Sequence, residues 1–325
     1  MFIARSRQGT RPMSHPMSHS GLHRWRKMQM VLLPLLLLGG CLLAISGWRP
    51  VTAQTASISA PDTVVLPPVQ IHLPLTFGEA TEVAECLTAS SSSYETTPIL
   101  GNPRDPNNLP IFDPDINLLV RGFKPTSGTL GLIGINGPTD EDAPQLAHLF
   151  RPVRVPAFRA LYQVHDWNWA CCPGGAVGQP IANPDVTLVE MATTPGESLF
   201  PAGRHANIGR DFVAMVLYAE KFRITFTYTR DDSPAQGYVI HIDNLCVDPN
   251  LLALYTEMHR EGRDDLPALR RGDSIGIAHS ASVLVAVRDT GSFMDPRSGK
   301  DWWQDTVRAM MAAQNAAAES TPPTP

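Results

Sequence analysis

The sequence predicts a mainly β fold: a β-sandwich or barrel-sandwich-like ectodomain with one inserted helix and a C-terminal helix, preceded by a hydrophobic N-terminal helix. Thirty prolines and 24 glycines among 325 residues are a high share of turn formers. Short apolar stretches with two-residue alternation recur along the chain, whereas clear helical periodicity is confined to two places after the N-terminal segment. Short strands joined by many loops account for these observations.

The N-terminal segment, residues 1–53, predicts export. Basic residues at 24–27 precede an apolar run at 30–48, and the small residues that follow suit cleavage by signal peptidase. The run is also long enough for an uncleaved membrane anchor, and residues 38–41 resemble a lipobox that would place a lipid on Cys41. In each case the bulk of the chain is extracytoplasmic, either secreted or anchored to the cell membrane.

The charge of the chain argues against nucleic acid as a partner. Its 31 acidic and 26 basic residues give a formal net charge of −5, without the basic excess that binds phosphate backbones. No glycine-rich phosphate loop occurs, so we expect no cofactor. Residues 272–276 read G-D-S-I-G, but they lack the strand-turn-helix context of a nucleophile elbow, so we do not expect Ser274 to act as a nucleophile. The expected partner is an envelope or extracellular ligand, a glycan or a protein, together with the membrane if the N-terminal segment stays attached.

Four cysteines beyond Cys41 favour two disulfides, because an even number of cysteines in an oxidising compartment is usually paired. They are Cys86, Cys171, Cys172 and Cys246. Adjacent cysteines rarely bond each other, because the bridge would be strained. We therefore expect Cys171 and Cys172 to reach separately to Cys86 and Cys246, and we leave the connectivity open. Free thiols are the second alternative, whereas a zinc site would need short fixed spacings, which this set lacks.

The first half of the exported chain is expected to contain a stalk and one β module. Residues 54–112 are rich in proline, serine and other turn formers, which predicts an irregular stalk. The module spans residues 113–185. Its strands are expected at 116–123, 129–135 and 158–169.

The second half is expected to form a second β module over residues 186–300. Asp248 as N-cap, Pro249 at the first helical position and a glycine near the end predict an inserted helix. Residues 301–325 are expected to form a terminal helix, capped by Asp301, and a disordered tail. Strands are expected at 186–191, 212–219, 222–229, 237–242, 274–278 and 283–288, with a tight hairpin joining the second and third of these.

Two tryptophans alternate with polar residues at 165–169, the densest aromatic and polar cluster of the chain. Trp167 and Trp169 share one face of the expected strand. They suit a stacking platform for a sugar ring, since an aromatic face beside hydrogen-bonding groups is what a carbohydrate needs. Alternatively they fill the core beside bridges formed by Cys171 and Cys172, which is the interpretation that the pattern favours.

A second aromatic and charged tract contains Phe293, Arg297, Trp302 and Trp303. If these side chains are exposed, they form a recognition surface with aromatic hot spots. The favoured alternative is that Trp302 and Trp303 start the terminal helix and seal it against the sheets. These four residues complete the candidate binding surface.

Three segments of the second module have glycine and apolar residues at the spacing of one known type of domain. They are the hairpin at 207–230, residues 269–276 and residues 287–296. The matching residues of the last two are Leu269, Gly272, Asp273, Ile275, Gly276, Val287, Arg288, Gly291, Asp295 and Pro296. With them, residues 186–297 resemble the β-sandwich core of the lysostaphin-type zinc endopeptidases. The resemblance implies a sandwich fold and, in an intact member of that family, zinc-dependent peptide hydrolysis.

The zinc ligands of that family are missing from the exported part of the chain. The family uses H-x-x-x-D and the second histidine of H-x-H, and neither motif occurs. Ser282 and Leu284 stand at the two histidine positions of H-x-H, and leucine cannot ligate zinc. The enzymatic alternative is a zinc-dependent peptidoglycan or protein hydrolase with non-standard ligands drawn from His165, His205, Asp211, His241 and Asp243.

The sequence therefore favours an exported, non-enzymatic envelope or extracellular β protein that acts in binding or assembly. In this interpretation the degenerate peptidase-like domain has no catalytic residues and no metal. The hydrolase is one alternative, and a subunit of a larger surface assembly is the other.

Overall fold

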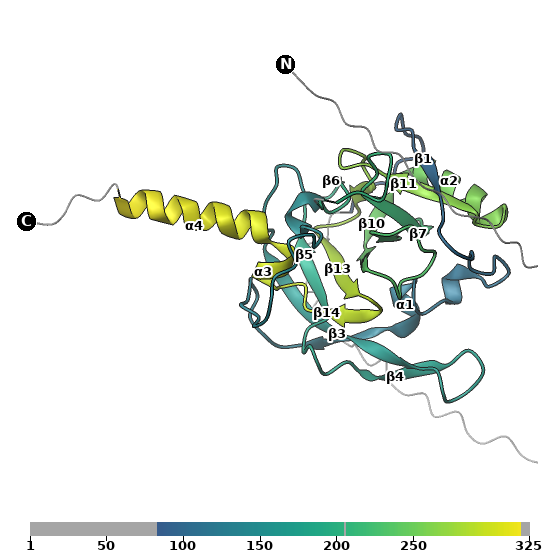
Figure 1. Ribbon diagram of the computed structural model, residues 1–325, viewed down its shortest axis with the longest axis horizontal. Helices are drawn as coiled ribbons and strands as arrows, with labels where there is room; N and C mark the ends of the chain where they lie inside the picture. The colour runs from purple at the N-terminus through teal and green to yellow at the C-terminus, as the bar shows by residue number, and fades with distance from the viewer. Residues whose placement is uncertain (1–82, 205, 320–325) are drawn as a thin grey trace, which may run out of the picture. The chain divides into compact units, whose positions relative to one another are not determined.

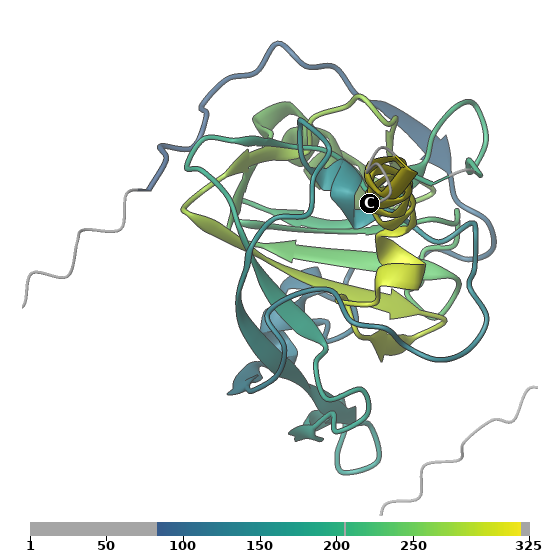
Figure 2. The ribbon, with the colours of Figure 1, turned by 90° about the vertical axis from the view of Figure 1, so that its left-hand side faces the viewer.

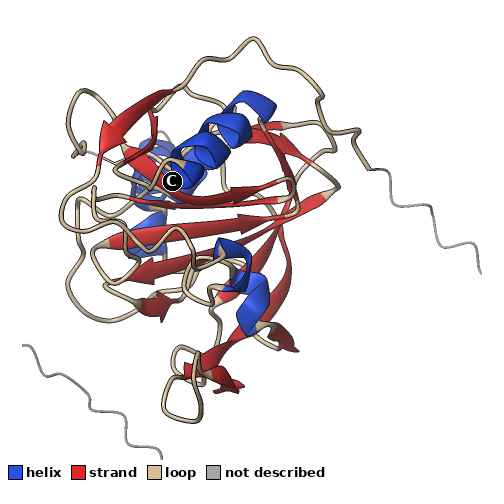
Figure 3. Ribbon diagram, turned by 90° about the vertical axis from the view of Figure 1, so that its right-hand side faces the viewer, coloured by secondary structure: helices blue, strands red, loops and turns tan. Residues whose placement is uncertain are grey.

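Antiparallel strands make up most of the regular structure (Figure 3). The computed structural model describes residues 83–204 and 206–319. The expected export segment 1–53, with its hydrophobic helix and Cys41, lies outside these ranges. Within them, no helix is both long enough and apolar enough to cross a membrane.

The strands of the described residues are mostly short. They are β1 (Glu95–Pro98), β2 (Phe123–Thr126), β3 (Phe158–Asn168), β4 (Ala176–Pro180), β5 (Leu188–Ala192), β6 (Ser198–Leu199), β7 (Ala214–Glu220), β8 (Arg223–Thr227), β9 (Tyr238–Asp243), β10 (Leu245–Val247), β11 (Asp265–Leu269), β12 (Gly276–Ala278), β13 (Ser282–Asp289) and β14 (Ser292–Met294). The helices are α1 (Leu118–Arg121), α2 (Pro249–Arg260), α3 (Gly299–Trp302) and α4 (Gln304–Glu319), with 3-10 turns η1 (Pro110–Phe112) and η2 (Leu146–Leu149).

One large sheet organises the described chain (Figure 1). Its strand order is β1-β11-β7-β8-β9-β13-β5-β3-β2, with β14 paired to β13 and β4 paired to β3. A smaller sheet has the order β10-β12-β6. Strands from both expected modules lie in the large sheet, since β3 pairs with β5 across residue 185. That boundary therefore does not separate two sheets.

Most strands expected from alternation are confirmed, with ends that differ by one or two residues. These are the strands at 158–169, 186–191, 212–219, 222–229, 237–242, 274–278 and 283–288. The tight hairpin is also confirmed, because Glu220 pairs with Arg223 across a two-residue turn. Strands β7, β8, β9 and β13 are buried along most of their length, so both faces of the sheet centre are covered.

Two expected strands are wrong. Residues 118–121 form helix α1, because Asn117 accepts a hydrogen bond from the Leu119 amide at its start and Gly122, at φ +68°, ends it. Residues 129–135 contain no strand and make only an isolated bridge at Ile133. Glycines at every third position of this stretch weaken a strand, because they offer no side chain to pack.

The inserted helix is confirmed as α2, which packs beside β11 and β7 (Figure 1). Asp248 caps it as expected, by accepting hydrogen bonds from the amides of Asn250 and Leu251. The terminal helix is confirmed too, although its start differs from the expectation. Asp301 lies inside the short α3, and α4 begins after Trp303 leaves the helical conformation.

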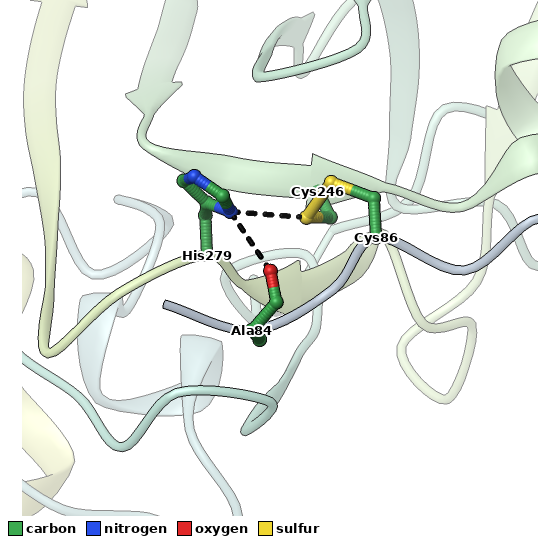
Figure 4. The surroundings of a disulfide bond; sticks show 4 residues. All are labelled: Ala84, Cys86, Cys246 and His279. Carbon is green, nitrogen blue, oxygen red and sulfur yellow. Dashed lines mark hydrogen bonds between the residues drawn. A yellow bond between two sulfur atoms is a disulfide. The ribbon is translucent and has the colours of Figure 1, made fainter. Parts of the chain in front are cut away.

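A disulfide fastens the segment before β1 to the body (Figure 4). It joins Cys86 to Cys246, 160 positions apart, whereas Cys171 and Cys172 are free, exposed thiols. The expectation that the adjacent pair reaches to the other two cysteines is therefore wrong. Part of the expected stalk belongs to the fold, since β1 pairs with β11 at the sheet edge.

Candidate functional site

Four of the six residues of the expected binding surface are buried: Phe293, which is 6% exposed, and three residues near the start of the terminal helices. Arg297, Trp302 and Trp303 are 3%, 2% and 0% exposed. Arg297 donates to both carboxylate oxygens of Asp295, and the indole N–H groups of the two tryptophans donate to the carbonyls of Asp295 and Pro296. The burial of these three residues contradicts a recognition surface here and agrees with the favoured alternative, in which Trp302 and Trp303 seal the start of the terminal helix.

The other three expected residues, Trp167, Trp169 and Phe293, line one hollow of about 540 Å³. Trp169 also lines a hollow of about 780 Å³ and another of about 390 Å³. Because Trp169 lines all three hollows, we call them together the Trp169 groove. Their walls come from residues 104–121, 166–183 and 288–293.

The β3–β4 hairpin forms one wall of the Trp169 groove and extends away from the sheet centre (Figure 2). Trp169 is 57% exposed, and its ring lies edge-on to that of Trp167, 6.1 Å away. The Trp167 indole N–H donates to the Gly174 carbonyl at 3.0 Å. Gly175 has φ +75°, and a Cβ there would come within 2.2 Å of the Trp167 indole nitrogen. The favoured expectation that this pair fills the core is wrong for Trp169.

Two buried arginines line the 540 Å³ hollow. Arg121, from α1, donates through Nη2 to Asp115 Oδ1 at 2.8 Å, and Arg288, from β13, donates to the same oxygen at 3.3 Å. Both guanidinium groups lie over the Phe293 ring, with 5.4 and 4.9 Å from the guanidinium carbon to the ring centroid. The aromatic ring and the shared carboxylate hold the two cations side by side.

His241 lies behind this cluster on β9, 1% exposed and stacked on Phe293. Its Nδ1 is 2.9 Å from the Thr225 hydroxyl, which donates its own hydrogen to the Ile116 carbonyl. The ring must therefore donate from Nδ1, and Nε2 is left without a partner. Burial lowers the pKa of His241 well below 6.5, and the nearby positive charges of Arg288 and Arg121 lower it further.

The Trp169 groove continues beyond its aromatic centre. Arg104 and Asp113 form an ion pair that lines the 390 Å³ hollow, where Phe112 is 70% exposed. The same ion pair lines a further hollow of about 240 Å³ that is bordered by His259 and Arg263.

The non-standard zinc ligands expected for a hydrolase do not gather in the described residues. No three of His165, Asp211, His241 and Asp243 lie close enough together to hold a metal ion, and His205 lies outside the description. His165 binds the Gly178 carbonyl through Nδ1 at 2.9 Å. Burial raises the pKa of Asp243 to about 6, although the neighbouring Arg223 opposes this shift.

A different set of potential metal ligands does lie together: Cys86, Cys246 and His279, whose ligand atoms are within 4.8 Å of one another. Figure 4 shows the histidine ring turned toward the sulfur of Cys246 and the Ala84 carbonyl. The two sulfur atoms are bonded to each other. They therefore act here as a disulfide and not as the thiolates that bind metals.

Sequence reasoning missed Arg121, Arg288 and Asp115 as parts of the site. One signal was available for Arg121, which is the single charged residue of the apolar stretch 116–123. A charged residue in such a stretch is rarely buried unless it is paired. In comparisons with known proteins, no family model, no curated protein and no solved structure matches this chain.

Proposed function

We propose that this chain is a non-enzymatic, extracytoplasmic β protein that binds a glycan in the Trp169 groove. The observation that carries the proposal is the exposed Trp169 side chain, which lies where three hollows meet. Several hollows that share one exposed ring face fit a chain-like ligand with flat apolar surfaces and many hydroxyl groups. An oligosaccharide has both properties.

Polar groups beside the two tryptophans support this ligand class. Asn168, Asn183 and Gln179 line the 780 Å³ hollow with amides that both donate and accept hydrogen bonds. Binding sites for small molecules combine such convergent polar groups with aromatic walls. A purely apolar peptide would leave these amides without partners.

The region that resembles a peptidase sandwich also supports a role without catalysis. Ser282 and Leu284, at the positions of the family's H-x-H, lie on β13. The Ser282 hydroxyl donates to Glu190 at 2.7 Å, and Leu284 packs against a small apolar cluster. We retain the sandwich as the proposed finer description of the fold, with a hydrogen bond and apolar packing at the two positions that correspond to the family's H-x-H. The disulfide suits the oxidising destination that the export segment predicts.

Removal of the Trp169 ring tests the proposal. We expect wild-type protein to bind members of a panel of soluble neutral and acidic oligosaccharides, and Trp169→Ala to weaken that binding by about ten-fold or more, as for an aromatic hot spot. Titration calorimetry gives the affinities. The matched control is Met311→Ala, which removes an equally exposed apolar side chain from α4, outside the groove. Binding that is equally strong in Trp169→Ala, or absent from the wild type, would refute the proposal.

A further inference from the structure

The arginine pair in the Trp169 groove has less negative charge around it than its burial requires. The side chains of Arg121 and Arg288 are each 5% exposed, and both pair with Asp115. Burying a charge is costly unless an opposite charge compensates it. Here one carboxylate compensates two cations.

The remaining partners of the pair are mostly neutral. Arg288 donates to the carbonyl oxygens of Gly291 and Asp115, and Arg121 donates to those of Pro114 and His165. These carbonyls satisfy hydrogen bonds without cancelling charge. The net balance at the base of the hollow is therefore positive.

Asp166 is the other acid that lines this hollow, and it compensates poorly. Its carboxylate is 3.8 Å from Arg121 Nη1 and its side chain is 74% exposed. Water screens an ion pair at that distance and exposure, so its contribution is small. The Arg121 Nη1 group has one other acceptor, the His165 carbonyl at 3.4 Å, and thus has capacity for a closer acceptor.

The pKa shifts of Arg288 and His241 agree with an excess of positive charge at the base of this hollow. The pKa of Arg288 is lowered to about 10, mainly by burial and in part by the charge of Arg121, although Asp115 opposes the shift. The same two arginines help to keep His241 neutral. A cationic partner in this hollow would meet unfavourable charge, whereas an anion would not.

We propose that the Trp169 groove selects acidic glycans, with the carboxylate of a sugar unit held at Arg121 and Arg288 while a sugar ring stacks on Trp169. This inference rests on the proposed function and adds the chemical class of the ligand. The arginines, Trp167 and Trp169 line the same 540 Å³ hollow, so a single ligand can contact all of them. A carboxylate is the group that a guanidinium fork recognises best, together with phosphate.

The test compares oligouronides with the same oligosaccharides after chemical reduction of their carboxyl groups. We expect the acidic form to bind wild-type protein about ten-fold more tightly, and we expect this preference to shrink as salt is raised. Arg121→Gln should remove most of the preference while leaving the weaker binding of the neutral form.

Asp166→Asn provides a variant that does not disturb the buried cluster. The asparagine can still accept the Trp167 amide, as the Asp166 Oδ1 atom does, but it no longer competes for Arg121. We expect it to tighten binding of the oligouronide by a few fold and to leave the neutral form unchanged. Asp211→Asn, the same charge change at an exposed site that does not line the groove, should alter neither affinity.

The outcomes separate the two proposals. Equal affinity for the acidic and the reduced oligosaccharides, or a preference for the acidic form that persists in Arg121→Gln, overturns the charge selection and leaves the groove as a glycan site. If no oligosaccharide of either kind binds, the proposed function fails and the selection fails with it.

Discussion

His241 is held neutral by its surroundings, and this has a consequence for stability. Its Nδ1–H is used by Thr225, and a proton on the unpartnered Nε2 would add a third positive charge beside Arg121 and Arg288. In the unfolded chain the imidazole takes up a proton below about pH 6.5. The unfolded state therefore binds more protons than the folded state below that pH.

This difference in proton binding makes the stability of the folded state depend on pH. The contribution of His241 to stability is complete above about pH 6.5 and declines as the pH falls through that value. His241→Gln should reduce the dependence of the free energy of unfolding on pH between about 6.5 and 5, relative to wild type. Urea unfolding at several pH values measures both slopes, and the other titrating groups cancel in their difference. An identical slope in the two proteins would contradict the assignment.

The sequence predicted the aromatic residues of the candidate site better than its charged ones. Alternation placed Trp167 and Trp169 on one face of a strand but did not say which face meets solvent, because a two-residue period only assigns the residues that share a face. For Trp302 and Trp303 the favoured prediction was burial at the start of the terminal helix, and the structure buries both. The arginine pair depends on Asp115, which lies 173 positions from Arg288.

Among the elements, α2 was predicted most fully, because its signals are local. Asp248 is the best example, since it is 4% exposed, caps the helix and also accepts a hydrogen bond from the Ser90 hydroxyl at 2.6 Å. The cap thus joins the helix to the segment that precedes β1. Local signals also gave a wrong prediction. Residues 116–123 look like a strand, but Asn117 starts and Gly122 ends a single helical turn within them.

Asp248→Ala should therefore lower the free energy of unfolding by about 1–2 kcal/mol, because it leaves the Asn250 and Leu251 amides without their acceptor. Asp248→Asn is the matched control, since its side-chain oxygen can still cap the helix and should retain most of the stability. Urea unfolding at neutral pH compares the three proteins. Equal losses in the two variants would show that charge, and not the cap, is what matters at this position.

At the scale of the whole molecule, the sequence predicted the strands but not their neighbours. β1 and β11, or β9 and β13, pair across long stretches of chain, and alternation carries no information about which strand will be adjacent. The same limit explains the error in the cysteines. The even number of cysteines predicted that all four are bonded. The fold instead brings Cys86 next to Cys246 and leaves Cys171 and Cys172 at an exposed hairpin tip.

The last prediction concerns how this covalent link stabilises the molecule. A bridge across 160 positions restricts the unfolded chain strongly, and loops of this length correspond to roughly 2–5 kcal/mol. Replacing Cys86 and Cys246 by alanine should lower the free energy of unfolding by that order, because the segment before β1 would then be held only by non-covalent contacts such as the Ser90–Asp248 hydrogen bond. The control replaces Cys171 and Cys172 by serine, and it should change stability by less than about 0.5 kcal/mol because both thiols are exposed. Urea unfolding without reductant measures both variants. A larger loss in the control than in the bridge variant would mean that the hairpin thiols, and not Cys86 and Cys246, form the stabilising link.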